Sequence, residues 1–445
     1  MFQEYLKGEK MKKGINLIKN IFLFCSYCLI LNLQASDLPK ASPEDYGFST
    51  EKLSELKPML DPIVDEGKLP NYLVAIYSDG NLIYQSMKGK ADEENNIDIA
   101  HNTIFAQFSM TKPIVSAAIL QLVESGEISL DDNLEDFYPA FSSMMVAPDG
   151  YFEKTMVESA RSINVRDLLT HTAGFTYGEQ VVGIGDVAKI YDELNPSGQW
   201  GRSTQEAMDV LSEIPLVSQP GDEFNYSVAI DVLGAIIEKV SGKSLMEYLK
   251  DELLDPLEMN DTAFAFQGEQ LERVAQIYAA APQRTVQVPG QTKSYVPMFG
   301  NNPNPYCRLE PNFYSGGGGI CTSADDFARF STMILNKGIL NGKRVLSEES
   351  VRLMTENLLP RKLGRNALQN SFGDFAGNMH FGAGLGIVLK GDTDQTDYYW
   401  WAGAANTFFW IDPDNNTVGI FLSQHFPVTF NLIDKLEAHV EDSQI

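Results

Sequence analysis

Ser109 and Lys112 have the residue types and the spacing that covalent catalysis needs. They lie three positions apart at the start of a segment predicted to be helical, so they share one helix face and Lys112 can reach Ser109 Oγ. A serine hydroxyl is a poor nucleophile until a neighbouring base takes its proton. The free N–H groups and positive dipole of a helix N-terminus suit a developing oxyanion. The pair is therefore a candidate nucleophile with an amine partner.

The Ser-x-x-Lys pattern is not specific by itself. Two other matches lie in a charged amphipathic stretch, where we expect cap and surface residues: Ser49…Lys52 and Ser54…Lys57. Ser109 differs because apolar residues flank it at 104–108 and 113–123, which predicts a helix buried nearly all round. The alternative is an ordinary N-cap serine beside a lysine whose stem lies on apolar surface.

Tyr226 is the second candidate. The turn at Pro220-Gly221 delivers it just before an apolar helix predicted over Val228–Val240. A phenol is a poor base at neutral pH, but an adjacent lysine cation would lower its pKa and make a phenolate accessible. The alternative is a half-buried core tyrosine.

The segment Tyr399–Thr407 is the third candidate. Its small residues, Ala402, Gly403 and Ala404 among them, allow a substrate to approach the backbone closely. A free N–H here could be a second oxyanion donor beside that of Ser109. The alternative is a buried edge strand next to an aromatic cluster.

Three further motifs carry less weight. His171 invites a Ser–His–Asp interpretation, but no serine has a Gly-x-Ser-x-Gly surround, so we expect a structural histidine at a loop end. The run Gly316–Gly319 lacks the Lys-Ser/Thr of a phosphate loop and predicts a close backbone approach beside the site. Asp412–Asn416 resembles the start of a calcium loop but continues with Thr417 and Ser423 at the positions of Gly and Glu.

The N-terminal residues 1–36 predict a signal peptide. Met11-Lys12-Lys13 opens a basic region, an apolar core runs from Ile21 to Leu33, and Gln34–Ser36 offers small residues for cleavage. Residues 1–10 are then an upstream extension of a true start at Met11. An uncleaved inner-membrane anchor is the alternative. Export to the periplasm or medium follows from the leading interpretation.

The four cysteines divide between leader and mature chain. Cys25 and Cys28 lie in the apolar core and leave with the signal, whereas Cys307 and Cys321 remain. An exported protein meets an oxidising compartment, so Cys307 and Cys321 can form a disulfide there, but the sequence does not decide whether they do. They lack metal-ligand spacing, and no metal site is predicted.

Length and composition indicate a large globular unit. The chain has 445 residues, of which 44% are hydrophobic, and a net charge of −26 spread along its length. Such a balance argues against nucleic acid and anionic membrane surfaces as partners. No membrane contact is expected beyond the leader.

Strands are predicted near both chain ends. One hairpin joins Asn71–Ser78 to Asn81–Gln85 through Asp79-Gly80, and a second joins Thr407–Ile411 to Thr417–Leu422. A helix is expected at about Phe430 to His439. The middle is predicted to be mostly helical: Ser109–Gly126, Val165–Thr170, Thr204–Ile214, Val228–Val240 and Leu245–Leu254.

This order predicts an α+β fold in which both chain ends build one antiparallel sheet. Residues 37–445 would form a single catalytic domain. Its sheet lobe would comprise about 40–100 and 312–445, and its all-helical lobe, inserted in the sheet, about 101–311. The site would lie between the lobes.

Five motifs in this order resemble the serine β-lactamase-related superfamily: Ser109-x-x-Lys112, Leu168–Phe175, Pro220-Gly with Tyr226-Ser227, Ser315–Asp326 and Trp401-Ala-Gly403. That superfamily includes class C β-lactamases, penicillin-binding DD-peptidases and family VIII carboxylesterases. The resemblance covers about residues 45–440. It implies an antiparallel sheet flanked by helices, an all-helical lobe, and acyl transfer through a serine ester without a cofactor.

The resemblance also implies roles by motif position. Ser109 would be the nucleophile, Lys112 would hold the proton network, and Tyr226 would be the general base that later protonates the leaving group. Lysine and tyrosine are treated as one titrating unit. The backbone N–H groups of Ser109 and Ala404 would form the oxyanion hole.

Two departures favour the esterase branch. Position 228 is Val where β-lactamases and DD-peptidases carry Asn, and Trp401-Ala402-Gly403 stands where they carry Lys-Thr-Gly. A tryptophan offers an apolar wall in place of a grip on a carboxylate. Trp401 and Gly403 are therefore expected to contact substrate. Tyr177 is expected to line the site or to assist the tyrosine base.

The leading expectation is an exported serine carboxylesterase that cleaves small-molecule, short-chain acyl esters. A class C β-lactamase or DD-peptidase-like amide hydrolase is the alternative. A catalytically inactive relative that serves as a binding protein is the third interpretation, and no oligomeric state is predicted.

Overall fold

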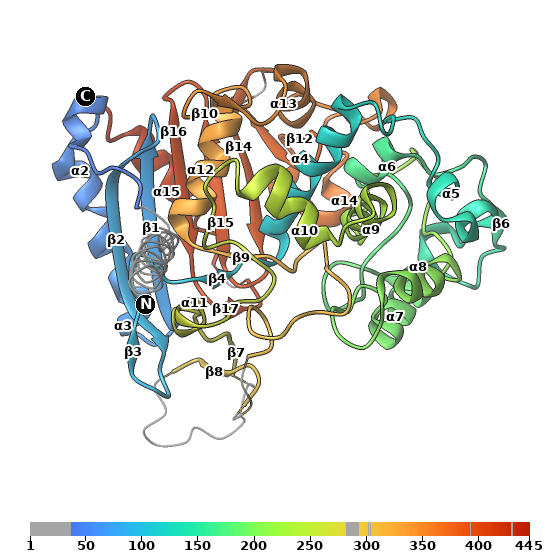
Figure 1. Cartoon of the computed structure of the whole chain (residues 1–445), viewed down its shortest axis with the longest axis horizontal. Helices are drawn as coiled ribbons and strands as arrows, with labels where there is room; N and C mark the ends of the chain where they lie inside the picture. Colours follow the sequence, from blue (N-terminus) through green and yellow to red (C-terminus); the bar gives the residue numbers. More distant parts are fainter. Residues whose placement is uncertain (1–36, 282–292, 301, 303, 392, 429) are drawn as a thin grey trace, which may run out of the picture. The chain divides into compact units, whose positions relative to one another are not determined.

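An eight-stranded antiparallel sheet forms the centre of the computed structural model, which describes residues 37–281, 293–300, 302, 304–391, 393–428 and 430–445 (Figure 1). The strand order is β12-β13-β14-β15-β16-β1-β2-β3. These strands span Met379–Phe381, Gly386–Leu389, Thr396–Gly403, Thr407–Asp412, Thr417–Leu422, Asn71–Ser78, Asn81–Asp92 and Ile97–Asp98.

The two ends of the chain meet in the middle of this sheet, where β1 pairs with β16 and Leu73 lies opposite Leu422. The β1–β2 hairpin turns at Asp79 and Gly80, whose φ values of 48° and 73° are those of the tight turn that their sequence predicts. Both predicted hairpins are present, and β2 is longer than expected.

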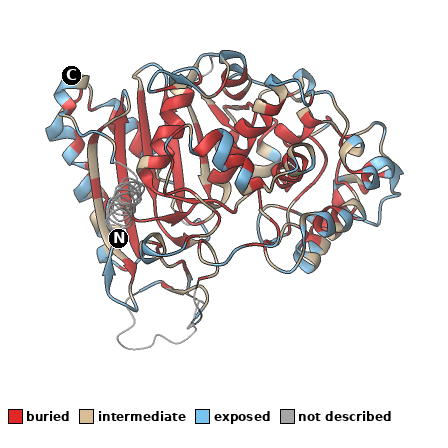
Figure 2. Cartoon of the chain, in the orientation of Figure 1, coloured by how far each residue is buried: buried red, intermediate tan, exposed pale blue. Residues whose placement is uncertain are grey.

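Helices cover both faces of the sheet. All eight residues of β1 are buried (Figure 2). Tyr72 and Tyr77 point to opposite faces because side chains alternate along a strand. The Tyr72 hydroxyl donates to Asp61 on α3 (Leu56–Asp65), and the Tyr77 hydroxyl donates to Asp325 on α12 (Ala324–Leu335). The two helices therefore lie on opposite sides.

Smaller strand pairs connect the sheet to the rest of the chain: β4 (Phe105–Ala106) with β9 (Cys321–Thr322), β5 (Met145–Val146) with β6 (Val157–Glu158), β10 (Ile339–Leu340) with β11 (Lys343–Arg344), and β17 (His425–Phe426) with β7 (Tyr278–Ala280) and β8 (Tyr295–Pro297). The β4–β9 pair matters most for function because it directly precedes Ser109.

Helices dominate the middle of the chain. Eleven of the fourteen residues of α4 (Thr111–Glu124) are buried, as its apolar sequence predicts, and it packs on α9. The other helices are α2 (Thr50–Ser54), α5 (Leu134–Phe137), α6 (Val165–Leu169), α7 (Gly185–Leu194), α8 (Thr204–Ser212), α9 (Ala229–Ser241), α10 (Leu245–Leu249), α11 (Glu269–Glu272), α13 (Glu348–Thr355), α14 (Gln369–Phe372) and α15 (Ile433–Glu441).

The α+β expectation is confirmed, with local differences at element ends. Ser109 lies in a short 3₁₀ turn, Phe108–Met110, that leads into α4 rather than in the helix itself. The predicted 245–254 helix ends in a π-helical turn, Lys250–Leu254. The last helix begins at Ile433, later than expected. The lobe boundaries stay a prediction.

Cys307 and Cys321 form a disulfide. Residues 1–36, with Cys25 and Cys28, lie outside the described part of the chain. Within residues that the structure describes, no helix is long and apolar enough to cross a membrane, and no cluster of three or more His, Cys, Asp or Glu could hold a metal ion.

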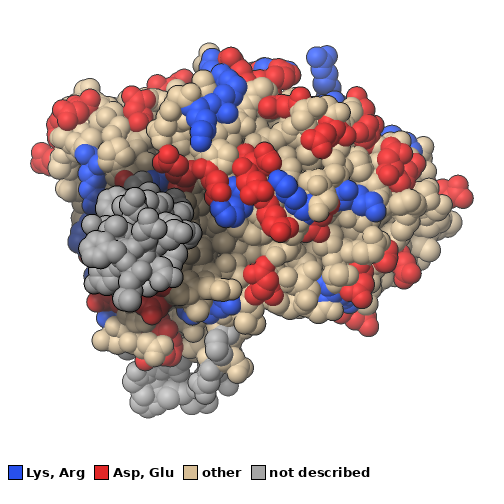
Figure 3. Space-filling view, viewed as in Figure 1, with Lys and Arg blue, Asp and Glu red and all other residues tan. Residues whose placement is uncertain are grey.

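Acidic side chains are spread over the face drawn in Figure 3, with lysines and arginines between them.

Candidate active site

Ser109 and Lys112 meet as their spacing predicts. Lys112 Nζ lies 3.1 Å from Ser109 Oγ, and the lysine is completely buried. The two other Ser-x-x-Lys matches are surface features: Ser49 caps α2, and Ser54 Oγ donates to the Glu51 carbonyl. Burial therefore distinguishes the Ser109 pair from the others.

Lys112 Nζ has two further partners: the Tyr177 hydroxyl at 3.0 Å and the Gly317 carbonyl at 2.6 Å. A carbonyl oxygen only accepts, so one N–H always points at Gly317. A neutral amine has two N–H groups and one lone pair, and it can therefore accept a hydrogen bond from Ser109 while donating to the other two. This arrangement can take a proton from the serine.

The two tyrosines contact Lys112 differently. Lys112 Nζ lies 4.8 Å from the centre of the Tyr226 ring and 5.3 Å from that of Tyr177. Burial, with the charge of Asp231, raises the pKa of Tyr177 well above its usual value, so Tyr177 stays a neutral phenol. Tyr177 is thus placed to share hydrogen bonds with Lys112 rather than to act as a phenolate. The general-base role of Tyr226 stays a prediction.

Asp231 fixes the carbonyl that Lys112 contacts. Its Oδ1 accepts from Ser315 Oγ at 2.5 Å and from the Gly317 N–H at 2.9 Å. A Cβ on Gly317 would lie 2.4 Å from Asp231 Oδ2, and one on Gly316 would lie 2.5 Å from the Ile230 carbonyl. The glycine run is therefore the close backbone approach that the sequence predicts. Asp231 lies outside the motifs that mark the other site residues in the sequence.

Asp231→Asn is expected to lower kcat/KM on esters about tenfold, because the amide matches the carboxylate in shape but not in charge. Ser315→Ala keeps the carboxylate and is the matched control. An equal fall in kcat/KM in both variants would contradict this role of Asp231.

The end of β14 runs directly against the backbone that precedes Ser109. A Cβ on Gly403 would lie 2.1 Å from the Gln107 carbonyl and 2.3 Å from Thr407 Oγ1. Thr407 Oγ1 also donates to that carbonyl at 3.2 Å. Ala404 occupies the turn between β14 and β15 and therefore adjoins the Ser109 turn. Its predicted partnership with the Ser109 N–H in an oxyanion hole stays a prediction.

Gly403→Ala tests this arrangement. The added methyl group must push the β14 end away from Gln107, so the Ala404 N–H moves relative to Ser109. We expect kcat to fall about 10²-fold, the lower range for loss of one oxyanion donor. Ala402→Ser is a control of similar size one residue away. Full activity of Gly403→Ala would show that the turn is not part of the oxyanion site.

Phe108, the residue before the nucleophile, has a left-handed backbone conformation with φ 48°. A bulky residue in this region stores about 1–3 kcal/mol, and such strain is concentrated at functional sites. It is held in place by the flanking hydrogen bonds, Gln107 N–H to the Ile320 carbonyl at 3.0 Å and Ile320 N–H to Thr111 Oγ1 at 3.1 Å. No sequence pattern predicts this strain.

The rings of Trp401, Phe372 and Phe381 pack around Tyr226, and together these four rings are called the aromatic wall. Trp401 is only 3% exposed, and its ring lies 5.5 Å from Tyr226, 5.8 Å from Phe372 and 5.2 Å from Phe381. Phe372 is half-buried and therefore presents the open ring surface here. Ser371, beside it on α14, accepts a hydrogen bond from the Tyr226 N–H at 3.1 Å. The substrate contact expected of Trp401 stays a prediction.

His171 is placed as a structural residue. It is fully buried, and its Nδ1 lies 3.3 Å from the Ser227 N–H. Burial and the charge of Lys112 lower the pKa of His171, which keeps the imidazole neutral. Its ring packs on Tyr226 at 4.9 Å. His171 thus supports the tyrosine and does not contact Ser109.

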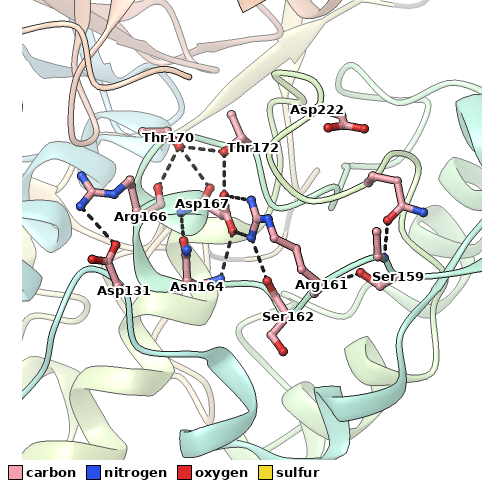
Figure 4. Close-up of polar contacts among 12 residues, drawn as sticks. Asp131, Ser159, Arg161, Ser162, Asn164, Arg166, Asp167, Thr170, Thr172 and Asp222 are labelled. Carbon is pink, nitrogen blue, oxygen red and sulfur yellow. Dashed lines mark hydrogen bonds and ion pairs between the residues drawn. The ribbon is translucent and has the colours of Figure 1, made fainter. Parts of the chain in front are cut away.

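A polar network around Asp167 holds the start of α6 and the residues that follow this helix (Figure 4). Asp167 accepts from both terminal nitrogens of Arg161, at 2.6 and 2.8 Å, and from the Asn164 N–H at 3.0 Å. It also accepts from Thr172 Oγ1 at 3.3 Å. Asp167 therefore ties the start of α6 to the segment that follows it.

Asp167→Ala is expected to lower the free energy of unfolding by about 2 kcal/mol, because it leaves donors of this network without an acceptor. Arg161 keeps 43% of its side chain exposed, so the loss is smaller than for a fully buried ion pair. Asp131→Ala is the control, because Asp131 is 76% exposed and forms a surface ion pair with Arg166 at 3.3 Å. Its loss should change the free energy of unfolding little. Urea unfolding of both variants measures the difference, and equal losses would contradict it.

Comparison with known proteins identifies the family. A profile of the Beta-lactamase family matches residues 56–441. An uncharacterized protein of Mycobacterium tuberculosis is 30% identical over 374 residues, which make up 82% of this chain and 88% of that relative. The chain belongs to the Beta-lactamase family.

Two further relatives are named for their activities. Esterase EstB of Burkholderia gladioli is 31% identical over 300 residues, 65% of this chain and 72% of EstB. A putative D-alanyl-D-alanine carboxypeptidase of Escherichia coli is 24% identical over 421 residues, 88% of this chain and 87% of that protein. The chain is thus a serine hydrolase with esterase and peptidase relatives, as its motifs predict.

Solved structures share the fold of this chain. Simvastatin synthase (LovD) from Aspergillus terreus has a TM-score of 0.71 at 21% identity and covers 89% of this chain and 98% of its own. EstCE1, a hydrolase with promiscuous acyltransferase activity, has a TM-score of 0.68 at 22% identity, covering 88% and 98%. At these identities the likeness shows the fold.

Proposed function

We propose that this Beta-lactamase family member is an exported serine carboxylesterase that cleaves short acyl esters. The observation that carries the proposal is the buried Lys112 amine, 3.1 Å from Ser109 Oγ. Buried amines are stripped of water and exchange protons readily with neighbouring hydroxyls. The relative EstB is an esterase, which supports the ester substrate.

Acylation uses Ser109 as nucleophile. Ser109 Oγ attacks the ester carbonyl carbon while its proton passes to the unit of Lys112 and Tyr226, with neutral Tyr177 holding the amine in place. The N–H groups of Ser109 and Ala404 stabilise the tetrahedral oxyanion. The bond to the alcohol oxygen then breaks, and that oxygen takes the proton from the same unit.

Deacylation reverses these roles. A water molecule attacks the acyl-serine ester, gives its proton to the Lys112–Tyr226 unit, and the proton returns to Ser109 as the acid leaves. Tyr226 presents its ring rather than its hydroxyl to Lys112 in the free protein, and such contacts tighten when substrate binds.

The apolar character of the aromatic wall favours ester substrates over β-lactams. The Tyr226, Phe372 and Trp401 rings form an apolar surface, and Val228 replaces a polar amide. An apolar wall gives no charge partner for the carboxylate of a β-lactam or a D-alanine terminus. Export follows from the basic and apolar composition of residues 11–36.

Parallel hydrolysis of p-nitrophenyl butyrate and nitrocefin tests the substrate class. We expect fast ester cleavage and little nitrocefin turnover. Efficient nitrocefin cleavage would overturn the proposal and support the amide hydrolase. Failure of both, with no labelling by a fluorophosphonate probe, would support the inactive binding relative.

A further inference from the structure

A second group of aromatic rings surrounds the residue before the nucleophile. We call it the Phe108 cluster, and its members are Phe108, Trp200, Phe299, Tyr306 and Phe426. Tyr306 lies at its centre, with ring centres 5.1 Å from Phe108, 5.1 Å from Trp200 and 6.2 Å from Phe299. Phe108 also lies 6.1 Å from Phe426. All five side chains are half-buried, so the cluster keeps open ring surface.

Covalent and backbone ties fasten this cluster to the Ser109 turn. Cys307, next to Tyr306, is bridged to Cys321 on β9. Cys321 pairs in turn with Ala106, two residues before Phe108. A Cβ on Gly318 would lie 3.7 Å from the Phe108 backbone, so the glycine run lies against the same turn. The cluster is therefore built at a fixed position beside the nucleophile.

The surroundings of the cluster are apolar. Its members other than Trp200 pack on a core group that includes Ile104, Val274 and Ile277. Burial raises the pKa of Tyr306, which keeps its hydroxyl neutral. Large, partly exposed rings that pack on apolar side chains bind flat apolar groups by stacking and edge contacts.

An ester has an acyl half and an alcohol half, and the direction of proton transfer indicates on which side of Ser109 each half lies. In the proposed mechanism the leaving alcohol takes its proton from the Lys112–Tyr226 unit, so the alcohol lies on that side of Ser109. Among the described rings, the members of the Phe108 cluster make no ring contact with Tyr226, Phe372 or Trp401. The acyl group would then lie on the other side of the carbonyl carbon, away from the Lys112–Tyr226 unit.

We propose that the Phe108 cluster is the acyl-binding subsite and that it takes flat, apolar acyl groups such as phenylacetyl or cinnamoyl. This inference rests on the proposed esterase function and narrows its substrates from short acyl esters in general to esters whose short acyl chain carries an aromatic ring. The acyl chain lies against the rings, while the alcohol half lies against the wall of Phe372 and Tyr226.

Rates on two esters with the same leaving group test the assignment. We compare kcat/KM for p-nitrophenyl phenylacetate and p-nitrophenyl butyrate. The wild type should prefer the phenylacetate. Tyr306→Leu should reduce that preference about three- to tenfold, the range for loss of aromatic contacts. Phe372→Leu, the matched control on the alcohol side, should change both rates by the same factor.

The opposite pattern would overturn the subsite. An unchanged preference in Tyr306→Leu places the acyl group elsewhere. So does a loss of preference in Phe372→Leu that is as large as the loss in Tyr306→Leu. Titration of Ser109→Ala with methyl phenylacetate, followed by Trp200 fluorescence against a Trp200→Phe reference, gives a readout without turnover. If no ester is hydrolysed but Tyr306→Leu weakens this binding, the esterase proposal fails and the subsite stands. No binding overturns the subsite.

Discussion

Ser109→Ala is expected to abolish ester hydrolysis and leave the fold intact. Among the described residues, two hydroxyl groups lie within hydrogen-bond distance of Lys112 Nζ, those of Ser109 and Tyr177. Tyr177 stays protonated because its pKa is raised, which leaves Ser109 as the nucleophile. We expect kcat to fall by about 10⁴-fold or more, to what binding and the oxyanion site alone support. Ser109 is half-buried and its hydroxyl contacts Lys112. The free energy of unfolding, measured with urea, should therefore change by about 1 kcal/mol or less.

Ser54→Ala is the matched control because Ser54 belongs to another Ser-x-x-Lys match. Its hydroxyl donates to the Glu51 carbonyl on exposed α2, so activity should stay at the wild-type level. Turnover by Ser109→Ala above a few thousandths of the wild-type rate would contradict the assigned nucleophile.

Lys112→Met and Tyr226→Phe are expected to act on one unit. Each should lower kcat/KM about 10³-fold, within the range for loss of general acid–base catalysis. Methionine fills the buried volume that Lys112 leaves but cannot donate to Gly317 or exchange a proton with Ser109. Because the residues share one proton network, the double variant should be about as active as either single variant.

Tyr177→Phe is the reference for this pair. Tyr177 donates or accepts one bond on Lys112 but stays neutral, so its loss should cost about tenfold, well below that of Tyr226. Multiplied losses in the Lys112→Met, Tyr226→Phe double variant would contradict the shared network. A larger loss in Tyr177→Phe than in Tyr226→Phe would transfer the base role to Tyr177.

Much of the fold follows from local sequence signals. The Asp79-Gly80 turn between two apolar runs predicts β1 and β2, and the apolar run after Ser109 predicts α4. Both elements form where expected because their signals are short-range. The strands β12 and β13 and the short helix α14 lie within 360–394, where no periodicity marks them, so sequence did not predict them.

The site divides in the same way. The Ser109–Lys112 contact follows from helix spacing, whereas the Lys112 bonds to Tyr177 and Gly317 join residues 65 and 205 positions apart. Asp231 and Phe372 were missed because their neighbours at the site are distant in sequence. A buried acid on an apolar helix face was the one available signal for Asp231.

Trapping the acyl-enzyme tests the central claim most directly. The protein is mixed briefly with p-nitrophenyl butyrate, quenched in acid, digested and analysed by mass spectrometry. The account predicts one butyryl group on the peptide that contains Ser109, and no such adduct in Ser109→Ala. Hydrolysis of the ester with a butyryl group on another residue, or with none under burst conditions, would contradict Ser109 as the nucleophile.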